Sequence, residues 1–187
     1  MRRVYPDHIE PYENKLGAED LLGALIYGDI HHQLVDKLIS RKAYEKGVIF
    51  PQANLCEDIP ITIQLAYNSS SWGYLDETLY NYRFSPQSIT AAPSSKATSA
   101  QVQSNIALTL SFLESKGLSR KYRKNIRHMK CWTRFTALPL PRKEYMAVYP
   151  EVNLAILLDS RFTVKERLGH LTKMLGIHGI SKLFSKR

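Results

Sequence analysis

The chain has 187 residues and a net charge of +9, and 44% of its residues are hydrophobic. This length suits a single domain, and the hydrophobic content argues against disorder throughout. No apolar run approaches the ~18 residues that span a bilayer, and the N-terminal residues lack the pattern of a secretory signal. Two distant cysteines, Cys56 and Cys131, indicate neither a disulfide framework nor a zinc cluster. We therefore expect a reduced, cytoplasmic protein.

Charge is divided unevenly along the chain. Residues 1–95 hold 8 Lys and Arg against 12 Asp and Glu, whereas residues 96–187 hold 18 against 5. The two net charges are therefore −4 and +13. Such asymmetry is typical of a protein whose basic half meets an anionic partner, whether a nucleic acid, an acidic membrane surface or a phosphorylated ligand.

The pattern before residue 95 predicts a mixture of helices and strands. Hydrophobic spacing and end signals predict helices at 17–27, 41–46 and 58–67. Apolar and aromatic runs predict strands at 32–39 and 72–82, and residues 48–50 form a short apolar run that Pro51 stops. Residues 85–99 are rich in Ser, Pro, Ala and Thr, which predicts a loop and the best internal boundary.

The chain after this loop is expected to be helical throughout. Val102, Ile106, Leu110 and Leu113 recur at the spacing of one helix face. The helical segments are predicted at 98–116, 119–134, 142–149, 154–158 and 164–184. No glycine-rich phosphate-binding loop of the Walker or dinucleotide type is present.

Residues 31–90 carry a succession of short pieces in a fixed order. They are Asp36-Lys-Leu-Ile39, a basic helix at 41–46, Val48-Ile-Phe-Pro51, Glu57-Asp58, Leu79-Tyr-Asn-Tyr-Arg83 and Ser88-Ile-Thr90. This order resembles family-two glycosyltransferases of the GT-A type, which are common in bacterial polysaccharide and lipopolysaccharide synthesis. The resemblance covers about a third of the chain. One departure is Val35, where the family often has Trp.

The resemblance implies an α/β (α+β) fragment of a GT-A glycosyltransferase fold, followed by an all-helical C-terminal extension. Residues 1–95 would be the acceptor-side portion, and residues 96–187 a basic helical extension. The Asp-x-Asp motif and the parallel βαβ units that bind the nucleotide-sugar donor in this family are absent from the sequence. The chain is thus expected to be a truncated piece or degenerate paralogue that does not catalyse transfer alone.

The resemblance assigns Asp58 the role of catalytic base. In inverting transfer an acceptor hydroxyl loses its proton as it attacks the anomeric carbon, and a carboxylate within hydrogen-bond reach can take that proton. Neighbouring Glu57 would raise the basicity of Asp58 or orient the acceptor. The alternative is structural, because acidic residues at a helix start are favoured by capping and by the helix dipole.

Two further residues are candidate acceptor contacts beside Glu57. Trp72 could form the floor of a sugar site, and core or edge packing is its alternative role. Arg83 could bind a phosphate or an acidic acceptor, and a structural salt bridge is its alternative. We expect no metal site in this chain, because Mn²⁺ or Mg²⁺ with the nucleotide-diphosphate sugar belongs to the missing donor half.

A basic segment, residues 120–134, has seven Lys and Arg and no acid. Its candidate membrane or anion contacts are Arg120, Lys121, Arg123, Lys124, Arg127 and Lys130. With the amphipathic tail from Val164, it favours contact with an anionic membrane, which suits a lipid-linked sugar acceptor at the inner membrane face. A solvated helix face is the structural alternative. A non-catalytic membrane or nucleic-acid binding module is the alternative function, although no known nucleic-acid-binding motif supports the latter.

Overall fold

The computed structural model describes residues 18–75, 77, 79–81 and 95–177, and these are helical without a β-strand. The expectation of an α/β fragment is therefore wrong. The α-helices are α1 Ala18–Tyr27, α2 Arg41–Glu45, α3 Asp58–Asn68, α4 Lys96–Ser115, α5 Arg123–Thr136, α6 Arg142–Ala147, α7 Asn153–Leu158 and α8 Val164–Leu175. Two 3₁₀ turns are η1 Leu34–Asp36 and η3 Pro150–Val152.

The predicted strands at 32–39 and 72–82 are absent from the described residues for a common physical reason. A strand is stable only when a neighbouring strand takes up its backbone hydrogen bonds, and no described segment pairs with them. Residues 32–39 contain η1 instead, and the apolar run 48–50 has no regular secondary structure. The described part of 72–81 has no regular structure, and residue 82 lies outside the described residues. Strand propensity alone was thus a poor guide here.

The predicted helices are confirmed, with shifted ends. Helix α4 begins at Lys96 because Ser95 and Thr98 form a capping box, so the end of the predicted loop 85–99 is helical. Residues 82–94 lie outside the described residues. Helix α2 ends before Gly47, whose φ of +90° favours glycine. Helix α8 ends at Leu175 before Gly176, and the predicted continuation to residue 184 lies largely beyond the described residues.

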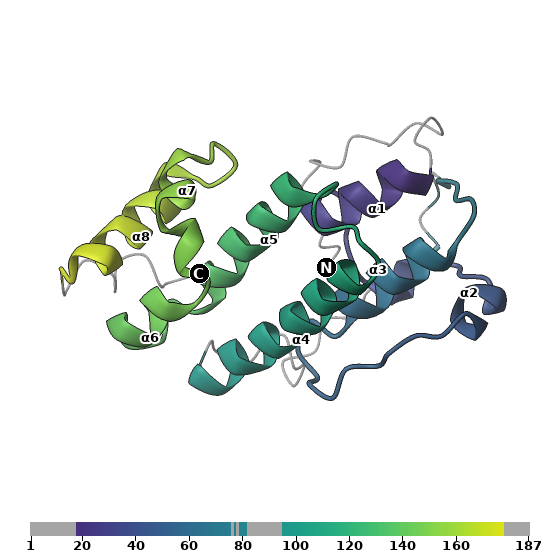
Figure 1. The fold of residues 1–187 in the computed structure, drawn as a ribbon, viewed down its shortest axis with the longest axis horizontal. Helices are drawn as coiled ribbons and strands as arrows, with labels where there is room; N and C mark the ends of the chain where they lie inside the picture. The colour runs from purple at the N-terminus through teal and green to yellow at the C-terminus, as the bar shows by residue number, and fades with distance from the viewer. Residues whose placement is uncertain (1–17, 76, 78, 82–94, 178–187) are drawn as a thin grey trace.

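Helices α1, α3, α4 and α5 surround the main hydrophobic core (Figure 1). Helices α1 and α3 come from the acidic half of the sequence, whereas α4 and α5 come from the basic half. The buried core residues of this group are Leu22, Leu25, Ile26, Ile59, Ile63, Ala66, Val102, Ile106, Phe112, Leu113, Tyr122 and Met129. Burial of these side chains is the main stabilising term of the fold.

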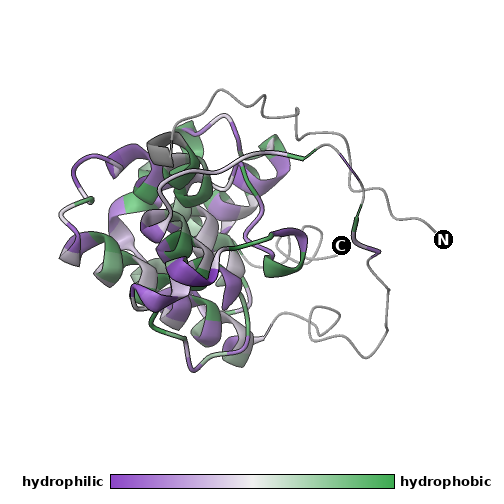
Figure 2. Ribbon diagram, turned by 90° about the vertical axis from the view of Figure 1, so that its right-hand side faces the viewer, coloured by the Kyte–Doolittle hydropathy of each residue, from purple (hydrophilic) through white to green (hydrophobic). Residues whose placement is uncertain are grey.

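Helix α5 also packs against a second group, α6, η3, α7 and α8, at the other end of the molecule (Figure 1). Two smaller buried clusters lie there, one around Ile156 and Phe162 and one around Tyr145 and Val148. Hydrophilic and hydrophobic residues alternate within the helices in Figure 2, as amphipathic helices require. Helix α5 therefore joins two helical groups.

Candidate functional site

The Glu57–Asp58 pair stands where the chain turns into α3. Asp58 is the first residue of the helix, and Glu57 occupies the N-cap position without a capping hydrogen bond from its side chain. Just before them, Cys56 has a φ of +60°, which is uncommon for a residue with a β-carbon. Backbone strain of this kind clusters at functional sites. A role in capping α3 therefore does not explain the acidic residue at position 57.

The loop that leads into this pair is fixed from two sides by amide side chains. Buried Asn105 of α4 donates from Nδ2 to the carbonyl oxygens of Ala53 at 3.1 Å and Leu55 at 2.8 Å. Gln64 of α3 accepts from the Ile49 N–H at 2.9 Å and donates to the Ile49 carbonyl at 3.0 Å. The Gln64 side-chain amide thus forms with the Ile49 backbone the two hydrogen bonds that a neighbouring strand would otherwise form. These bonds fix the approach to Asp58.

The Asp58 carboxyl is half-buried beside η1. Burial, with repulsion from Glu57, raises its pKa above the ordinary value, although a hydrogen bond with the backbone N–H of Leu34 and the charge of Lys37 oppose this. The raised pKa makes the carboxylate a stronger base. The first turn of α3 presents partial positive charge, which favours the ionised form. The site thus holds a basic carboxylate with part of its surface accessible.

The segments around Asp58 expose an unusual amount of apolar surface. Leu38, which follows the η1 turn that contacts Asp58, is fully exposed. Ile49 and Phe50, on the extended segment that Gln64 holds, are each 59% exposed. Further along, the exposed apolar and aromatic side chains are Tyr67, Tyr74, Leu75, Leu79 and Tyr80. Large exposed apolar surface marks an interaction site.

The other two predicted acceptor contacts, Trp72 and Arg83, follow α3 in the chain. Trp72 is half-buried and comes four residues after the last residue of α3, whereas Asp58 is the first. The helix between them is about 16 Å long at the α-helical rise. Arg83 lies outside the described residues. The structure therefore places Glu57 and Asp58 together at the start of α3, and Trp72 follows the end of that helix in the chain.

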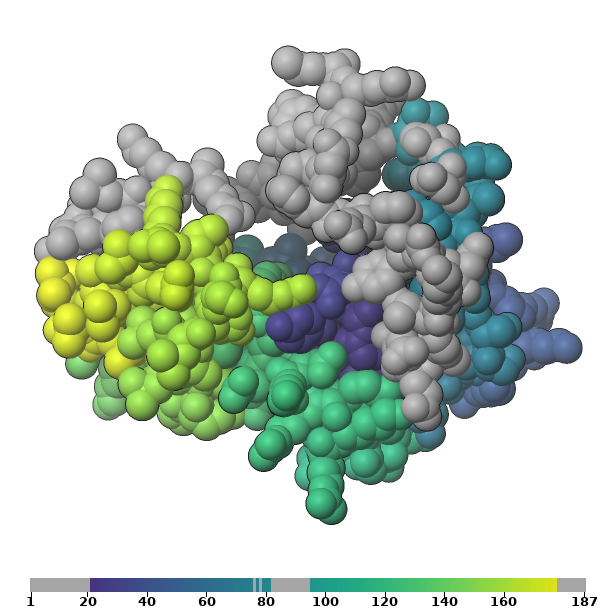
Figure 3. All heavy atoms as spheres, turned by 90° about the horizontal axis from the view of Figure 1, so that it is seen from above, coloured from purple at the N-terminus to yellow at the C-terminus, as the bar shows by residue number. Residues whose placement is uncertain are grey.

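The predicted basic contacts fall into two groups. Arg120, Lys121, Arg123, Lys124 and Arg127 are exposed on the α4–α5 turn and the first turns of α5. Long side chains project from this part of the surface, green at the lower centre of Figure 3. The first turn of α5 contains no acidic residue, so basic side chains add to the positive end of the helix dipole. An anion would relieve that repulsion.

Lys130 differs from the other predicted basic contacts. Its Nζ donates to Glu151 at 2.7 Å and lies 5.2 Å from the ring centroid of Tyr149. The side chain therefore bridges α5 to η3. The salt bridge helps to lower the pKa of Glu151 below its ordinary value, against the opposing effect of burial. Lys130 has a structural role here.

Sequence reasoning missed a buried cation, Arg134. Its side chain is fully buried and donates from Nη1 to Asn153 Oδ1 at 2.6 Å and from Nη2 to the Tyr149 carbonyl at 2.9 Å. Its Nε donates to the Val148 carbonyl. These contacts close the C-terminal end of α6 and the turn into η3. Position 134 ends a basic run in the sequence, and nothing local distinguishes it from its exposed neighbours.

A second missed feature is the buried pair of Tyr145 and His170. The Tyr145 hydroxyl donates to His170 Nδ1 at 2.6 Å, and His170 Nε2 donates to the Asn153 carbonyl at 2.9 Å. The His170 imidazole is thus neutral, with Nδ1 accepting one hydrogen bond and Nε2 donating the other. Burial lowers the pKa of His170. The pair fixes α8 against α6 and η3, which is a structural role.

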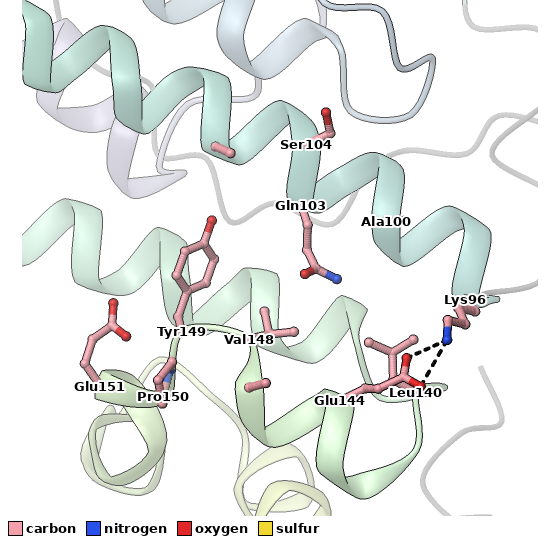
Figure 4. Close-up of a pocket in the computed structure, with 12 residues that line it drawn as sticks. Lys96, Ala100, Gln103, Ser104, Leu140, Glu144, Val148, Tyr149, Pro150 and Glu151 are labelled. Carbon is pink, nitrogen blue, oxygen red and sulfur yellow. Dashed lines mark hydrogen bonds and ion pairs between the residues drawn. The ribbon is translucent and has the colours of Figure 1, made fainter.

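A groove of about 780 Å³ runs between α4 and the α6–η3 segment (Figure 4). Its α4 wall consists largely of small side chains, and Lys96 pairs with Glu144 at one end. Tyr149, which has a φ of +50°, stands on the opposite wall. The Glu57–Asp58 pair lies outside this groove. The groove therefore provides no acceptor site for Asp58.

Two negative findings apply to the described residues only. No group of three or more His, Cys, Asp or Glu there could hold a metal ion. None of the helices in the same residues is both long and apolar enough to cross a membrane.

Comparisons with protein-family models, with curated proteins and with solved structures gave no match to this chain. The resemblance to family-two glycosyltransferases therefore depends on the residues between 31 and 90 alone.

Proposed function

We propose that this chain is an acceptor-side part of an inverting, nucleotide-sugar-dependent glycosyltransferase of bacterial surface-polysaccharide or lipopolysaccharide synthesis. Asp58 is its catalytic base, and Glu57 raises the basicity of Asp58 or orients the acceptor. A donor-binding part on another polypeptide segment supplies the nucleotide-diphosphate sugar with its Mn²⁺ or Mg²⁺. The chain alone is inactive in this proposal.

The observation that carries the proposal is the way Asp58 is held. Its loop is fixed by Asn105 and Gln64, its pKa is raised, and its side chain remains partly accessible. A raised pKa means that the ionised carboxylate is less stable in the folded chain than in water. A carboxylate with a purely structural role would gain nothing from this shift. A general base gains proton affinity from the same arrangement.

The reaction balances with this residue as base. The acceptor hydroxyl oxygen bonds to the anomeric carbon as the bond from that carbon to the diphosphate oxygen breaks. The hydroxyl proton passes to the Asp58 carboxylate, and the nucleoside diphosphate leaves with the electron pair of the broken bond. The divalent metal of the donor part neutralises charge on that leaving group.

The exposed apolar side chains around Asp58 support the need for a second part. Leu38 lies just after the η1 turn that contacts Asp58, and Ile49 and Phe50 lie on the loop that Gln64 holds; all three side chains are largely exposed. In a glycosyltransferase that places the donor beside the acceptor base, a donor-binding part would cover this surface. Burial of apolar area contributes about 25 cal/mol per Å², so such an association would be favourable.

The proposal is tested by reconstitution of transfer. A donor-binding part of a family-two glycosyltransferase is fused to the N-terminus of the chain, and sugar transfer from radiolabelled nucleotide-diphosphate sugars to lipid-linked sugars is measured. We expect transfer by the fusion and none by either part alone. A fusion carrying Phe50→Ser and Leu38→Ser should lose transfer through weaker association, whereas Glu114→Ser, an exposed position near the end of α4, should not.

A fusion that folds and buries the apolar surface but transfers no sugar from any donor to any acceptor would contradict the proposal. The burial is checked by hydrogen exchange of residues 34–50, which should slow in the fusion. This readout separates a failure of association from a failure of chemistry.

A further inference from the structure

The last described helix exposes its apolar side to solvent. Val164, Leu168 and Leu175 are 63%, 46% and 62% exposed. Their spacings of four and seven residues place them within about 40° of one another around the helix axis. The opposite side of α8 is buried through Gly169 and His170. The exposed stripe is thus a surface that the fold does not use for its own packing.

Helix α7, which packs against α8, repeats this feature. Leu154 and Leu158, one helical turn apart, are 68% and 83% exposed, whereas Ile156 between them is buried. The α7–α8 hairpin, residues 153–175, therefore carries five exposed aliphatic side chains. Five exposed aliphatic side chains on so short a segment exceed the single, scattered apolar residues of an ordinary protein surface.

Exposed basic side chains lie on α8 and on α6, which packs against α8. Lys165 of α8 and Lys143 of α6 are exposed, and Arg142 of α6 donates to the Met174 carbonyl near the end of α8. The one acidic residue of α8, Glu166, is engaged in the capping box with Thr163. The hairpin thus combines exposed leucines with local positive charge. That combination is typical of a helix that lies in the interface of an anionic bilayer.

We propose that the α7–α8 hairpin is a docking surface for an anionic membrane. The hairpin lies at one end of the molecule, opposite α2 (Figure 1). Complementary charge selects the anionic lipid, because residues 96–187 carry a net charge of +13. A nucleic acid would complement the positive charge but would offer no apolar layer to bury the leucines. The inference does not depend on the role of Asp58.

The test is sedimentation of the full chain with vesicles of phosphatidylcholine alone and with added phosphatidylglycerol. We expect binding to the anionic vesicles that weakens at least about tenfold in Leu168→Ser/Leu175→Ser, because two leucines no longer enter the apolar layer. Lys143→Glu/Lys165→Glu should also weaken binding about tenfold or more. The matched control is Leu75→Ser/Leu79→Ser, two exposed leucines far from the hairpin, which should bind as the wild type does.

Circular dichroism checks that each variant folds, and Leu154→Ser/Leu158→Ser on α7 provides a second pair should α8 fail that check. Equal binding to neutral vesicles, or equal loss in the control pair, would overturn the proposal. So would analytical ultracentrifugation showing a dimer that the α8 pair dissociates, since the stripe would then be an interface between copies of the chain. Salt-sensitive DNA binding without vesicle binding would also overturn it.

Discussion

The two ends of the molecule satisfy their polar groups in different ways. In the C-terminal group, buried side chains satisfy one another and nearby backbone, as Arg134 and His170 do with Asn153 and its neighbours. Around Asp58, the side-chain amides of Gln64 and Asn105 instead hold the backbone of a loop. Both regions expose apolar side chains, before α3 and on the α7–α8 hairpin. They differ in that the loop before Asp58 depends on single amide side chains for its conformation, whereas the C-terminal group has a buried polar network.

The largest expected effect on stability is in the C-terminal group. Arg134→Met should lower the free energy of unfolding by about 3–5 kcal/mol, because buried carbonyl groups lose their donors. Arg127→Met on the same helix replaces an exposed arginine and should change it by no more than about 0.5 kcal/mol. Urea denaturation of both variants measures the difference. Equal effects would mean that the Arg134 contacts do not stabilise this end of the molecule.

A smaller effect is expected where side chains hold the loop before Asp58. Asn105→Ala should cost about 1–3 kcal/mol, because the carbonyls of Ala53 and Leu55 lose a buried donor. Hydrogen exchange should accelerate over residues 49–56 and remain unchanged in the C-terminal group. Ser104→Ala, at the next position of α4 but exposed, is the control. Uniform acceleration across the chain would show that Asn105 supports the whole fold and not this loop.

The comparison of Arg134 with Asn105 also shows which features could be predicted from the sequence. Each helix was predictable, because spacing such as Val102, Ile106 and Leu113 is a local signal. Arg134 could not be distinguished from exposed Arg127, because burial depends on distant η3 and α6. The strands at 32–39 and 72–82 were predicted from local pattern and propensity, but strand pairing is a nonlocal property. Glu57 and Asp58 were placed correctly at a helix start, whereas the Asn105 clamp joins residues fifty positions apart.

Acid should weaken both regions through buried neutral histidines. Burial lowers the pKa of His32 from 6.5 to about 4, and burial lowers that of His170 as well. The unfolded chain binds more protons between these values, so stability is full above pH 6.5 and is lost as the pH falls towards 4. Urea midpoints measured from pH 7 to pH 4 test this. His32→Gln should reduce the slope, and an unchanged slope would rule out His32 as its source.

The smallest expected effect is a change in melting temperature, and its sign distinguishes a functional carboxylate from a structural one. Since the pKa of Asp58 is raised in the folded chain, its ionised form opposes folding as the pH rises above the ordinary value. Asp58→Asn should therefore raise the melting temperature slightly at pH 7. A residue that stabilises the start of α3 would instead lower it on substitution. Differential scanning calorimetry with Glu45→Gln, an exposed carboxylate of α2, as control decides between these outcomes.

The central claim is that Asp58 takes the acceptor proton, and it is tested most directly by kcat/KM for sugar transfer in the fusion with a donor-binding part. Asp58→Asn should lower kcat/KM by about 10²–10⁴-fold. Asp36→Asn, which removes a neighbouring exposed carboxylate, should leave it within about twofold. Undiminished transfer by a folded Asp58→Asn fusion would contradict the account.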